Sequence, residues 1–389
     1  MHKTNIGVFF GGKSPEHDVS IITGEFIISE LKKMGYEVTP VYLDKDGSWH
    51  INKNLGALKF FQKKNKKEYL KKFEKFYLDL EKSKNKIVFK KKGLIKKEIS
   101  INLAFPAFHG SNGEDGAIQG FFEIFNMPYV GCDVASSALA IDKVLTKLFY
   151  KSHNILTADF IYFDKIEWRE KKESILKIAE EKLKYPLFIK PPKLGSSIGI
   201  SKAKNKRELE FGIEVALHYG NAVLIEEGVE NLVDITCAVL GNKNSVASLI
   251  QESNFGGEFF NYEEKYLRDG GAQTGRAEKN IIIPARLDDA TTEAVQKMAL
   301  RIFSIFGCSG IARVDFLYNK ETKKIYANEV NTLPGTLYHH LWEASGIKFN
   351  ELLSRLIILA REKYNEKREI SHTFDSDILK MASSIKLKK

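Results

Sequence analysis

Short apolar runs and one helical pattern organise the first part of the chain. Ile6–Phe10, Val38–Leu43 and Ile101–Phe105 each have the length and composition of a buried strand. Between the first two runs, apolar residues from Val19 to Met34 recur at helical spacing. Strand, helix and strand in this order predict a small parallel α/β domain within about the first 125 residues.

Beyond residue 130 the pattern becomes mixed α+β. Helices are predicted at Ala135–Lys151, Trp168–Leu183 and Ala290–Phe306, and strands at Phe160–Phe163, Leu187–Lys190, Val223–Ile225, Asp234–Leu240, Ser245–Gln251 and Lys324–Val330. Residues 252–280 contain five glycines and many charges without a clear period. A loop of this length is typically a functional lid or a disordered segment.

The charge of the chain is concentrated in one segment. The 389 residues carry a formal net charge of +10, while residues 51–100 alone hold seventeen lysines and five acidic residues, a net +12. Within this lysine-rich segment, apolar residues at helical spacing predict an amphipathic surface helix from Tyr69 to Leu80. We therefore expect a solvated helix face, with no nucleic-acid or membrane partner; an anionic partner is the less favoured alternative.

Length and composition limit the class of protein further. No run of about 18 apolar residues could span a bilayer, and the N-terminus lacks the apolar core of a signal peptide. Cys132, Cys237 and Cys308 are far apart and outside any metal-ligand spacing, so we expect reduced thiols without a catalytic role. These features predict a soluble protein of the cytoplasm with two or three compact units.

Three oxygen-bearing side chains are expected to meet near the last predicted strand. Glu329 and Asn331 are two residues apart, so they point to the same side of a strand, and Asp315 on a paired strand can join them. Both carboxylates have apolar neighbours in sequence, where an unpaired carboxylate is costly. The cluster suits Mg²⁺, which takes one or two carboxylates and adds water and nucleotide phosphates. A solvated hairpin face is the alternative.

Other residues could contribute to a nucleotide site. Lys190 ends a predicted strand and precedes a glycine–serine turn with Ser196 and Ser197, whose amides and hydroxyls could surround phosphate oxygens. Lys143 could add a second positive charge, and Glu226 ends an apolar strand that could form a wall of an adenine pocket. Each of these features taken alone is also compatible with an ordinary surface turn, an exposed lysine or a strand end.

The loop His109-Gly110-Ser111-Asn112-Gly113-Glu114-Asp115-Gly116 is more specific, because it joins a strand to a helix N-terminus, where amides favour anionic groups. Further motifs follow the same order as in one known family: Gly11-Gly12-Lys13-Ser14-Pro15-Glu16-His17, the Lys190 loop, Lys265-Tyr266, Arg313-Val314-Asp315, and Asn331-Thr332-Leu333-Pro334-Gly335. From about Ile6 to Leu359 the chain resembles the D-alanine:D-alanine ligase family of the ATP-grasp superfamily.

This resemblance implies a three-domain ATP-grasp enzyme that makes the D-alanyl-D-alanine of peptidoglycan. ATP would phosphorylate the carboxylate of one D-alanine, and the amine of a second would attack the acyl phosphate. The expected domains are an N-terminal α/β domain at 1–130 with the lysine-rich segment inserted, a central subdomain at 131–225, and a C-terminal subdomain at 226–368 with a lid at 252–280. A basic tail follows at 369–389. The resemblance also implies a homodimer.

By position, the resemblance implies a role for each matched residue. The implied catalytic residues are Glu16, Ser196, Arg313 and the amide of Gly335, and the implied substrate-binding residues are His109, Glu114, Tyr266 and His340. The implied ATP-binding residues are Lys143, Lys190, Ser197, Glu226, Asp234 and Lys265. Asp315, Glu329 and Asn331 would hold two ions of Mg²⁺ or Mn²⁺.

Two positions depart from the family pattern. His340 stands five residues after Gly335, where the family commonly has a hydroxyl that binds the carboxylate of the second substrate. His340 either binds that carboxylate, as imidazolium or as a neutral donor, or is a packed residue. Asp234 replaces the usual ribose-binding glutamate. A related ligase with D-lactate, D-serine or another amino acid as acceptor is therefore an alternative, and a non-catalytic nucleotide-binding homologue is a less favoured one.

Overall fold

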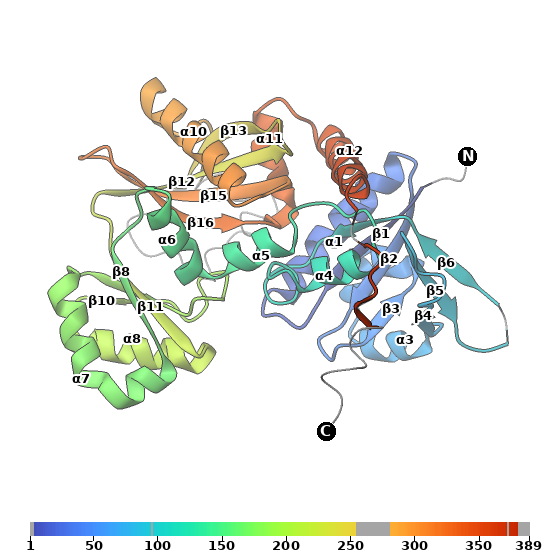
Figure 1. Cartoon of the computed structure of the whole chain (residues 1–389), viewed down its shortest axis with the longest axis horizontal. Helices are drawn as coiled ribbons and strands as arrows, with labels where there is room; N and C mark the ends of the chain where they lie inside the picture. Colours follow the sequence, from blue (N-terminus) through green and yellow to red (C-terminus); the bar gives the residue numbers. More distant parts are fainter. Residues whose placement is uncertain (1–3, 95, 254–280, 372, 380–389) are drawn as a thin grey trace.

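The computed structural model describes residues 4–94, 96–253, 281–371 and 373–379, and four sheets organise this part of the chain (Figure 1). In the first sheet, β1 (Asn5–Gly11) lies between β2 (Glu37–Leu43) and β7 (Leu103–Pro106) and is parallel to both, and β3 (Trp49–Ile51) adds an antiparallel edge. Helix α1 (His17–Lys33) connects the first two strands. The predicted parallel α/β arrangement is confirmed.

The helix predicted from Tyr69 to Leu80 is wrong. Helix α3 (Lys66–Lys72) ends before Phe73, which is extended, and β4 (Phe76–Leu78) then pairs antiparallel with β5 (Ile87–Lys91). Strand β6 (Glu98–Ile101) completes this second sheet. Pairing with β5 satisfies the backbone of β4, so a tertiary interaction overrides the local helical pattern.

The strand predicted at Ile101–Phe105 is divided at Asn102. Ile101 belongs to β6 in one sheet, and residues 103–105 belong to β7 in another. The amide of Asn102 donates to the carbonyl of Asn5, and the side chain of Asn102 accepts from the Asn5 amide. Two short elements, η1 (Lys53–Gly56) and α2 (Leu58–Phe61), precede α3. Helix α4 (Ala117–Ile124) buries Phe122 against the first sheet.

The third sheet is antiparallel, with the order β10-β9-β11-β8. Its strands are β8 (Phe160–Asp164), β9 (Leu187–Lys190), β10 (Ser201–Ala203) and β11 (Ala222–Glu227). Helices α7 (Lys165–Lys182) and α8 (Lys206–Tyr219) share a core with Ile189, Val223 and Ile225, so both helices cover the same face. The other face contributes to the site.

The fourth sheet has the order β14-β13-β12-β15-β16. Its strands are β12 (Leu232–Gly241), β13 (Val246–Ser253), β14 (Ile281–Ile282), β15 (Gly310–Asn319) and β16 (Ile325–Asn331). Side chains of β12 alternate between two cores: Cys237 and Val239 share one with α10 (Asp289–Ile305), and Ala238 and Leu240 share the other with α12 (Phe349–Arg368). Two short elements, η4 (Gly335–Tyr338) and α11 (His339–Ala344), connect β16 to α12.

Two further expectations concern the helices and the cysteines. Within the described ranges, no helix combines the length and the apolar character that crossing a bilayer requires. Cys132, Cys237 and Cys308 are buried and unbridged, as expected for reduced thiols.

The single helix predicted at Ala135–Lys151 is divided into α5 (Val134–Ile141) and α6 (Lys143–Ser152). Asp142 is extended, with φ −92° and ψ 103°, and its Oδ1 accepts hydrogen bonds from the amides of Val144 at 3.0 Å and Leu145 at 3.2 Å. Asp142 is thus the N-cap of α6 and places Lys143 at the first helical position.

Substitution Asp142→Ala should loosen α6 locally, because it removes the cap. Loss of an N-cap costs about 1 kcal/mol, so amide hydrogen exchange across residues 143–152 should be about fivefold faster. Asp142→Asn, which can still accept these bonds, is the matched control and should exchange nearly as slowly as the wild type. Equal exchange in all three proteins would show that the cap contributes nothing. Hydrogen-exchange mass spectrometry measures the difference.

Candidate functional site

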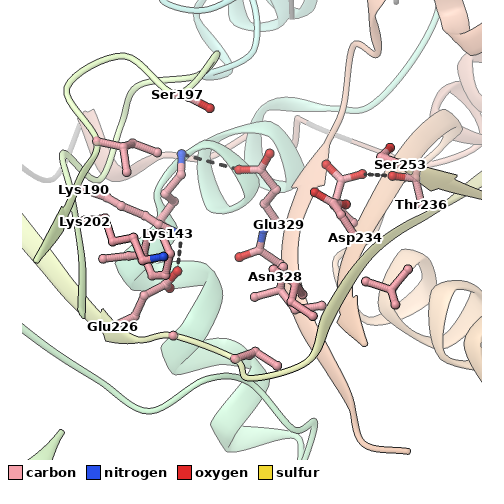
Figure 2. A pocket seen from close by; sticks show the side chains of 18 of the residues that line it. Lys143, Lys190, Ser197, Lys202, Glu226, Asp234, Thr236, Ser253, Asn328 and Glu329 are labelled. Atoms are coloured by element: carbon pink, nitrogen blue, oxygen red, sulfur yellow. Dashed lines mark hydrogen bonds and ion pairs between the residues drawn. The ribbon is translucent and has the colours of Figure 1, made fainter. Parts of the chain in front are cut away.

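A cleft of about 490 Å³ lies between the third and fourth sheets (Figure 2). The turn after β9 forms one wall, and β12, β15 and β16 form the opposite wall. Nine of the predicted site residues line this cleft: Lys143, Lys190, Ser196, Ser197, Glu226, Asp234, Arg313, Asp315 and Glu329. Residues that are far apart in the sequence thus meet around one cavity.

A buried carboxylate with two lysines forms one end of the cleft. Glu226 forms ion pairs with Lys190 and with Lys147, whose Nζ lies 3.0 Å from the Glu226 Oε2 atom. Burial by itself would raise the pKa of Glu226, but the two lysines reverse this effect and lower the pKa to about 2. Lys147 also donates to the Thr157 hydroxyl at 2.8 Å. This end of the cleft is therefore rigid and contains an ionised carboxylate.

Lys143 connects the turn after β9 to the strand on the opposite wall. Its Nζ donates to the carbonyl of Leu194 at 2.7 Å and lies 3.6 Å from the Glu329 Oε2 atom, as Figure 2 shows for the lysine and the glutamate. Ser196 and Ser197 in this turn have φ values of 54° and 57°, a left-handed conformation that is uncommon for serine. Such strained backbone often occurs at ligand-binding turns.

The predicted oxygen cluster forms where β15 pairs with β16. Asp315 is opposite Glu329 and Arg313 is opposite Asn331. Arg313 binds both oxygens of Asp315, with Nε to Oδ1 at 2.8 Å and Nη2 to Oδ2 at 2.5 Å. The Thr236 hydroxyl donates to Asp315 Oδ1 at 3.0 Å, and the Asn331 side-chain amide donates to Oδ2 at 3.1 Å. The residues are close enough to act on one ligand.

This cluster fits a divalent metal ion. Arg313 Nη2 lies 3.8 Å from Glu329 Oε1, so the two carboxylates meet positive charge from Arg313 and from Lys143. Because the Asn331 nitrogen donates to Asp315, its oxygen is the atom that remains to bind a cation. Two carboxylates and an amide oxygen are hard donors, which suit Mg²⁺ or Mn²⁺ together with phosphate oxygens.

A second group of predicted residues lies beside this cluster. The Ser196 hydroxyl donates to Glu16, which is buried at the N-terminus of α1. Glu114 lines a small cavity together with Lys143, Glu329 and others, so Glu114 borders the cluster. Burial raises the pKa of Glu114, as does the nearby Glu16, and His109 opposes these effects.

Thr23 connects His109 to the segment after β16. Its hydroxyl lies 2.9 Å from His109 Nε2 and accepts from the amide of Thr336 at 3.2 Å. Thr336 follows Gly335, which is buried at the start of η4. The His109 loop and the Gly335 segment are therefore connected through one buried threonine of α1.

His340 lies in α11 and does not carry positive charge at neutral pH. Its Nε2 lies 2.7 Å from Gln251 Oε1, and burial, with help from His339 and Arg313, lowers the pKa of His340 to about 4. The ring of Tyr338 contacts both His340 and Arg313. Its centroid lies 4.8 Å from that of the His340 ring and 4.9 Å from the Cζ atom of the Arg313 guanidinium. An imidazolium at His340 is therefore disfavoured, while a neutral donor and a packed residue both agree with these contacts.

Some residues of the predicted site belong to a part of the chain that the structure does not describe. Lys265, Tyr266 and nearly all of the predicted lid at 252–280 lie outside the described residues. Conversely, the sequence reasoning missed Lys147, Thr23 and Gln251. Lys147 lies one helical turn after Lys143, and this spacing was the available signal. Thr23 and Gln251 are ordinary residues in a helix and a strand, without a local pattern that distinguishes them.

The arrangement of the sheets and the charged cleft define a ligase of the ATP-grasp class. Two family models match the chain, D-ala D-ala ligase N-terminus at residues 5–132 and D-ala D-ala ligase C-terminus at residues 149–358. The chain therefore belongs to the D-alanine–D-alanine ligase family.

Named relatives cover almost the whole chain. The D-alanine–D-alanine ligase of Thermosipho melanesiensis is 40% identical over 97% of this chain and 98% of its own length. The enzyme of Caldicellulosiruptor bescii is 38% identical over 96% of this chain and 99% of its own length. The extent of these matches includes the N-terminal sheet, the cleft and α12.

Solved structures have the same three-domain ATP-grasp fold. The D-alanine-D-alanine ligase from Coxiella burnetii has a TM-score of 0.77 and 28% identity, with 95% of this chain and 97% of that chain covered. The VanG D-Ala:D-Ser ligase from Enterococcus faecalis has a TM-score of 0.77 and 31% identity, with 92% and 100% covered.

Substitution Glu226→Gln should destabilise the protein, because it leaves two buried lysines without a negative partner. Loss of one member of a buried ion pair costs about 3 kcal/mol. The ionised form of Glu226 stabilises the fold fully above the ordinary pKa of 4.5, and this contribution is lost as the pH falls through about 2. The wild type should therefore lose its advantage over the variant in that pH range.

Urea unfolding at several pH values measures this difference. Glu210→Gln is the control, because Glu210 pairs with Lys172 at an exposed position, where ion pairs contribute below about 1 kcal/mol. Equal stability of Glu226→Gln and Glu210→Gln at neutral pH would contradict the role assigned to the buried pair.

Proposed function

We propose that this protein joins two molecules of D-alanine to D-alanyl-D-alanine, using ATP and releasing ADP and phosphate. The observation that carries the proposal is the convergence of three elements at one cleft: the Lys143–Lys190 side, the Asp315–Glu329 pair, and the Glu16 side reached through Ser196. Membership of the ligase family supports the same activity. The product serves peptidoglycan synthesis.

ATP would lie between the two sheets. Glu226, held by Lys147 and Lys190, offers an ionised acceptor for an adenine amino group at the rigid end. Asp234 lines the same cleft and would reach the ribose. Lys143, Lys190 and the Ser196–Ser197 turn would contact the phosphates, since cations and hydroxyls suit phosphate oxygens.

Asp315, Glu329 and Asn331 would hold the divalent ions, with Mg²⁺ or Mn²⁺ and two ions as our proposal. The ions supply charge compensation between these carboxylates and the phosphate groups. Arg313 and Lys143, which face the carboxylates here, would turn part of their positive charge towards the reacting groups.

Glu16 would bind the ammonium of the first D-alanine, with His109 and Glu114 completing this subsite. The carboxylate of the same molecule would then extend towards Lys143 and the metal cluster, which border the small cavity lined by Glu114. Holding the reacting groups in this order replaces a collision in solution with a step inside one complex. Formation of the acyl phosphate requires this alignment.

Arg313 and the amide of Gly335 would stabilise the oxyanion that forms when the second amine attacks. The Tyr338 ring packs against the guanidinium, and Asp315 accepts two hydrogen bonds from it. Arg313 is therefore held in place before the reaction. Lys265 and Tyr266 in the proposed lid at 252–280 would close over the acyl phosphate and exclude water.

The second substrate is the least constrained part of this proposal. His340, as a neutral donor, could bind its carboxylate, or Gln251 could hold His340 as a packed residue. A D-serine or D-lactate acceptor is the alternative function, favoured by His340 and by the structural likeness to a D-Ala:D-Ser ligase. A non-catalytic homologue is disfavoured because the charged residues of the cleft are all retained.

The organisation of the chain completes the proposal. We place the domain boundaries near residues 130 and 225, with the C-terminal subdomain ending near 368, and expect a homodimer in the cytoplasm. These expectations rest on the family resemblance.

Incubation of the protein with ATP, Mg²⁺ and equimolar D-alanine, D-serine and D-lactate should give D-alanyl-D-alanine as the dominant product. Mass spectrometry of the products measures this outcome directly. A mixed or depsipeptide product would favour the alternative acceptor. Absence of any product despite ATP binding would overturn the proposed enzyme.

Substitution Arg313→Lys should lower kcat, because lysine keeps the charge but loses the paired donors of the guanidinium. Removal of one oxyanion donor typically costs about 10²–10³ in kcat. KM for ATP should change little. Arg301→Lys, at an exposed position where the guanidinium donates to the His153 carbonyl, is the control. A rise in KM for ATP with unchanged kcat would instead assign Arg313 to nucleotide binding.

A further inference from the structure

Within the lysine-rich segment (residues 51–100), the strands β5 and β6 form a projecting hairpin. Strand β5 is buried at its start, where Ile87 and Val88 are inaccessible, and β5 and β6 then extend beyond the body of the molecule at the right side of Figure 1. The third sheet, with one wall of the cleft, lies at the opposite end of the long axis. The hairpin is therefore remote from the proposed reaction.

The end of this hairpin combines positive charge with an exposed apolar side chain. Leu94 is fully exposed after Gly93, which has φ of 113° and open space around its Cα. Lys90 and Lys91 at the end of β5 precede it, and lysines at positions 92, 96 and 97 lie in the connection between β5 and β6. Among the described residues nothing covers the Leu94 side chain, so it adds no apolar burial to this part of the fold.

The few acidic residues of this sheet do not cancel its charge. From residue 74 to 101 there are nine lysines and four acidic residues. Glu74 is shared by Lys91 and Lys97, whose hydrogen bonds lower the pKa of Glu74 to about 2, and Asp79 pairs with Lys90. Within the described residues, Lys75, Lys92 and Lys96 have no ion-pair partner.

We infer that the described residues of this hairpin, 87–94 and 96–101, form a docking surface for an anionic lipid bilayer. Basic side chains gain about fivefold in binding each from the negative potential of such a surface, and this attraction acts within a Debye length. Leu94 enters the boundary between headgroups and acyl chains, where an apolar side chain leaves water. Lysine stems cover the surrounding apolar surface while their charges stay at the headgroups.

The apolar tip distinguishes a bilayer from a nucleic acid. A duplex nucleic acid offers phosphates to the lysines, but it buries a leucine between its bases only after a base step is unstacked at a cost of free energy, whereas a bilayer takes up Leu94 without such a cost. Tyr77, half exposed on the neighbouring β4, also suits a membrane interface, where an aromatic ring with a polar tip is favoured. The absence of a spanning helix among the described residues is compatible with attachment to one side of the bilayer.

The experiment is sedimentation of the full-length protein with vesicles of phosphatidylcholine, either pure or with about one third phosphatidylglycerol to give a negative surface. The protein should bind only the anionic vesicles at low salt and should dissociate as salt is raised. Substitution of Lys92 and Lys96 by glutamine should weaken binding about 25-fold in the double variant, as two lysines are lost. Leu94→Asn should weaken it about tenfold.

Lys171→Gln with Lys182→Gln is the matched control, because both lysines are exposed on α7 and lack an ion-pair partner within the described residues. This double variant should bind like the wild type. ADP release should be unchanged in all of these variants, which shows that they are folded and separates this inference from the proposed function.

Several outcomes would overturn the inference. One is absence of binding to anionic vesicles at low salt. Another is vesicle binding that survives the hairpin substitutions but is lost on removal of residues 370–389, which would assign it to the tail. Tighter binding to a double-stranded DNA fragment, insensitive to Leu94→Asn, would make the hairpin a nucleic-acid surface instead.

Discussion

Neutralisation of buried charge is the constraint on which the cleft depends. Glu226 can be ionised inside the protein only because Lys147 and Lys190 surround it, and Arg313 binds both oxygens of Asp315. A carboxylate without such partners would take up a proton or destabilise the fold. Lys190 and Glu226 both belong to the third sheet, and Arg313 and Asp315 both belong to the fourth, so each wall of the cleft carries its own ion pairs.

The same ion pairs explain how the site can respond to a ligand. Lys143 contacts both the turn after β9 and Glu329 of β16, so it spans the two walls. A triphosphate with metal ions would bring both signs of charge into this cleft. The lysines would then pair with the phosphates and the carboxylates with the metal ions, so that no charge is left uncompensated. Preorganised partners of this kind lower the cost of rearrangement during catalysis.

The position of the helix break at Asp142 shows how local structure affects the site. A continuous helix from residue 135 to 151 would satisfy the local pattern, but the cap at Asp142 starts a new helix at Lys143. The amide of Lys143 also donates to the carbonyl of Pro192 at 3.0 Å, which connects the beginning of α6 to the turn after β9. The direction of this lysine thus depends on a contact 49 residues away in sequence.

Sequence alone determined β1, β2, the approach of Asp315 to Glu329 and Asn331, and the order of the motifs, because buried strands and adjacent-strand geometry have local periods. Tertiary structure decided what local periods cannot encode. Phe76 and Tyr77 belong to a series of apolar residues at helical spacing, but they pair with β5. Thr23, Lys147 and Gln251 acquire their contacts from partners distant in sequence. The free energy of burying and pairing such groups depends on neighbours that only the folded chain brings together. It outweighs the helix or strand propensity of the local sequence, which is small for each residue.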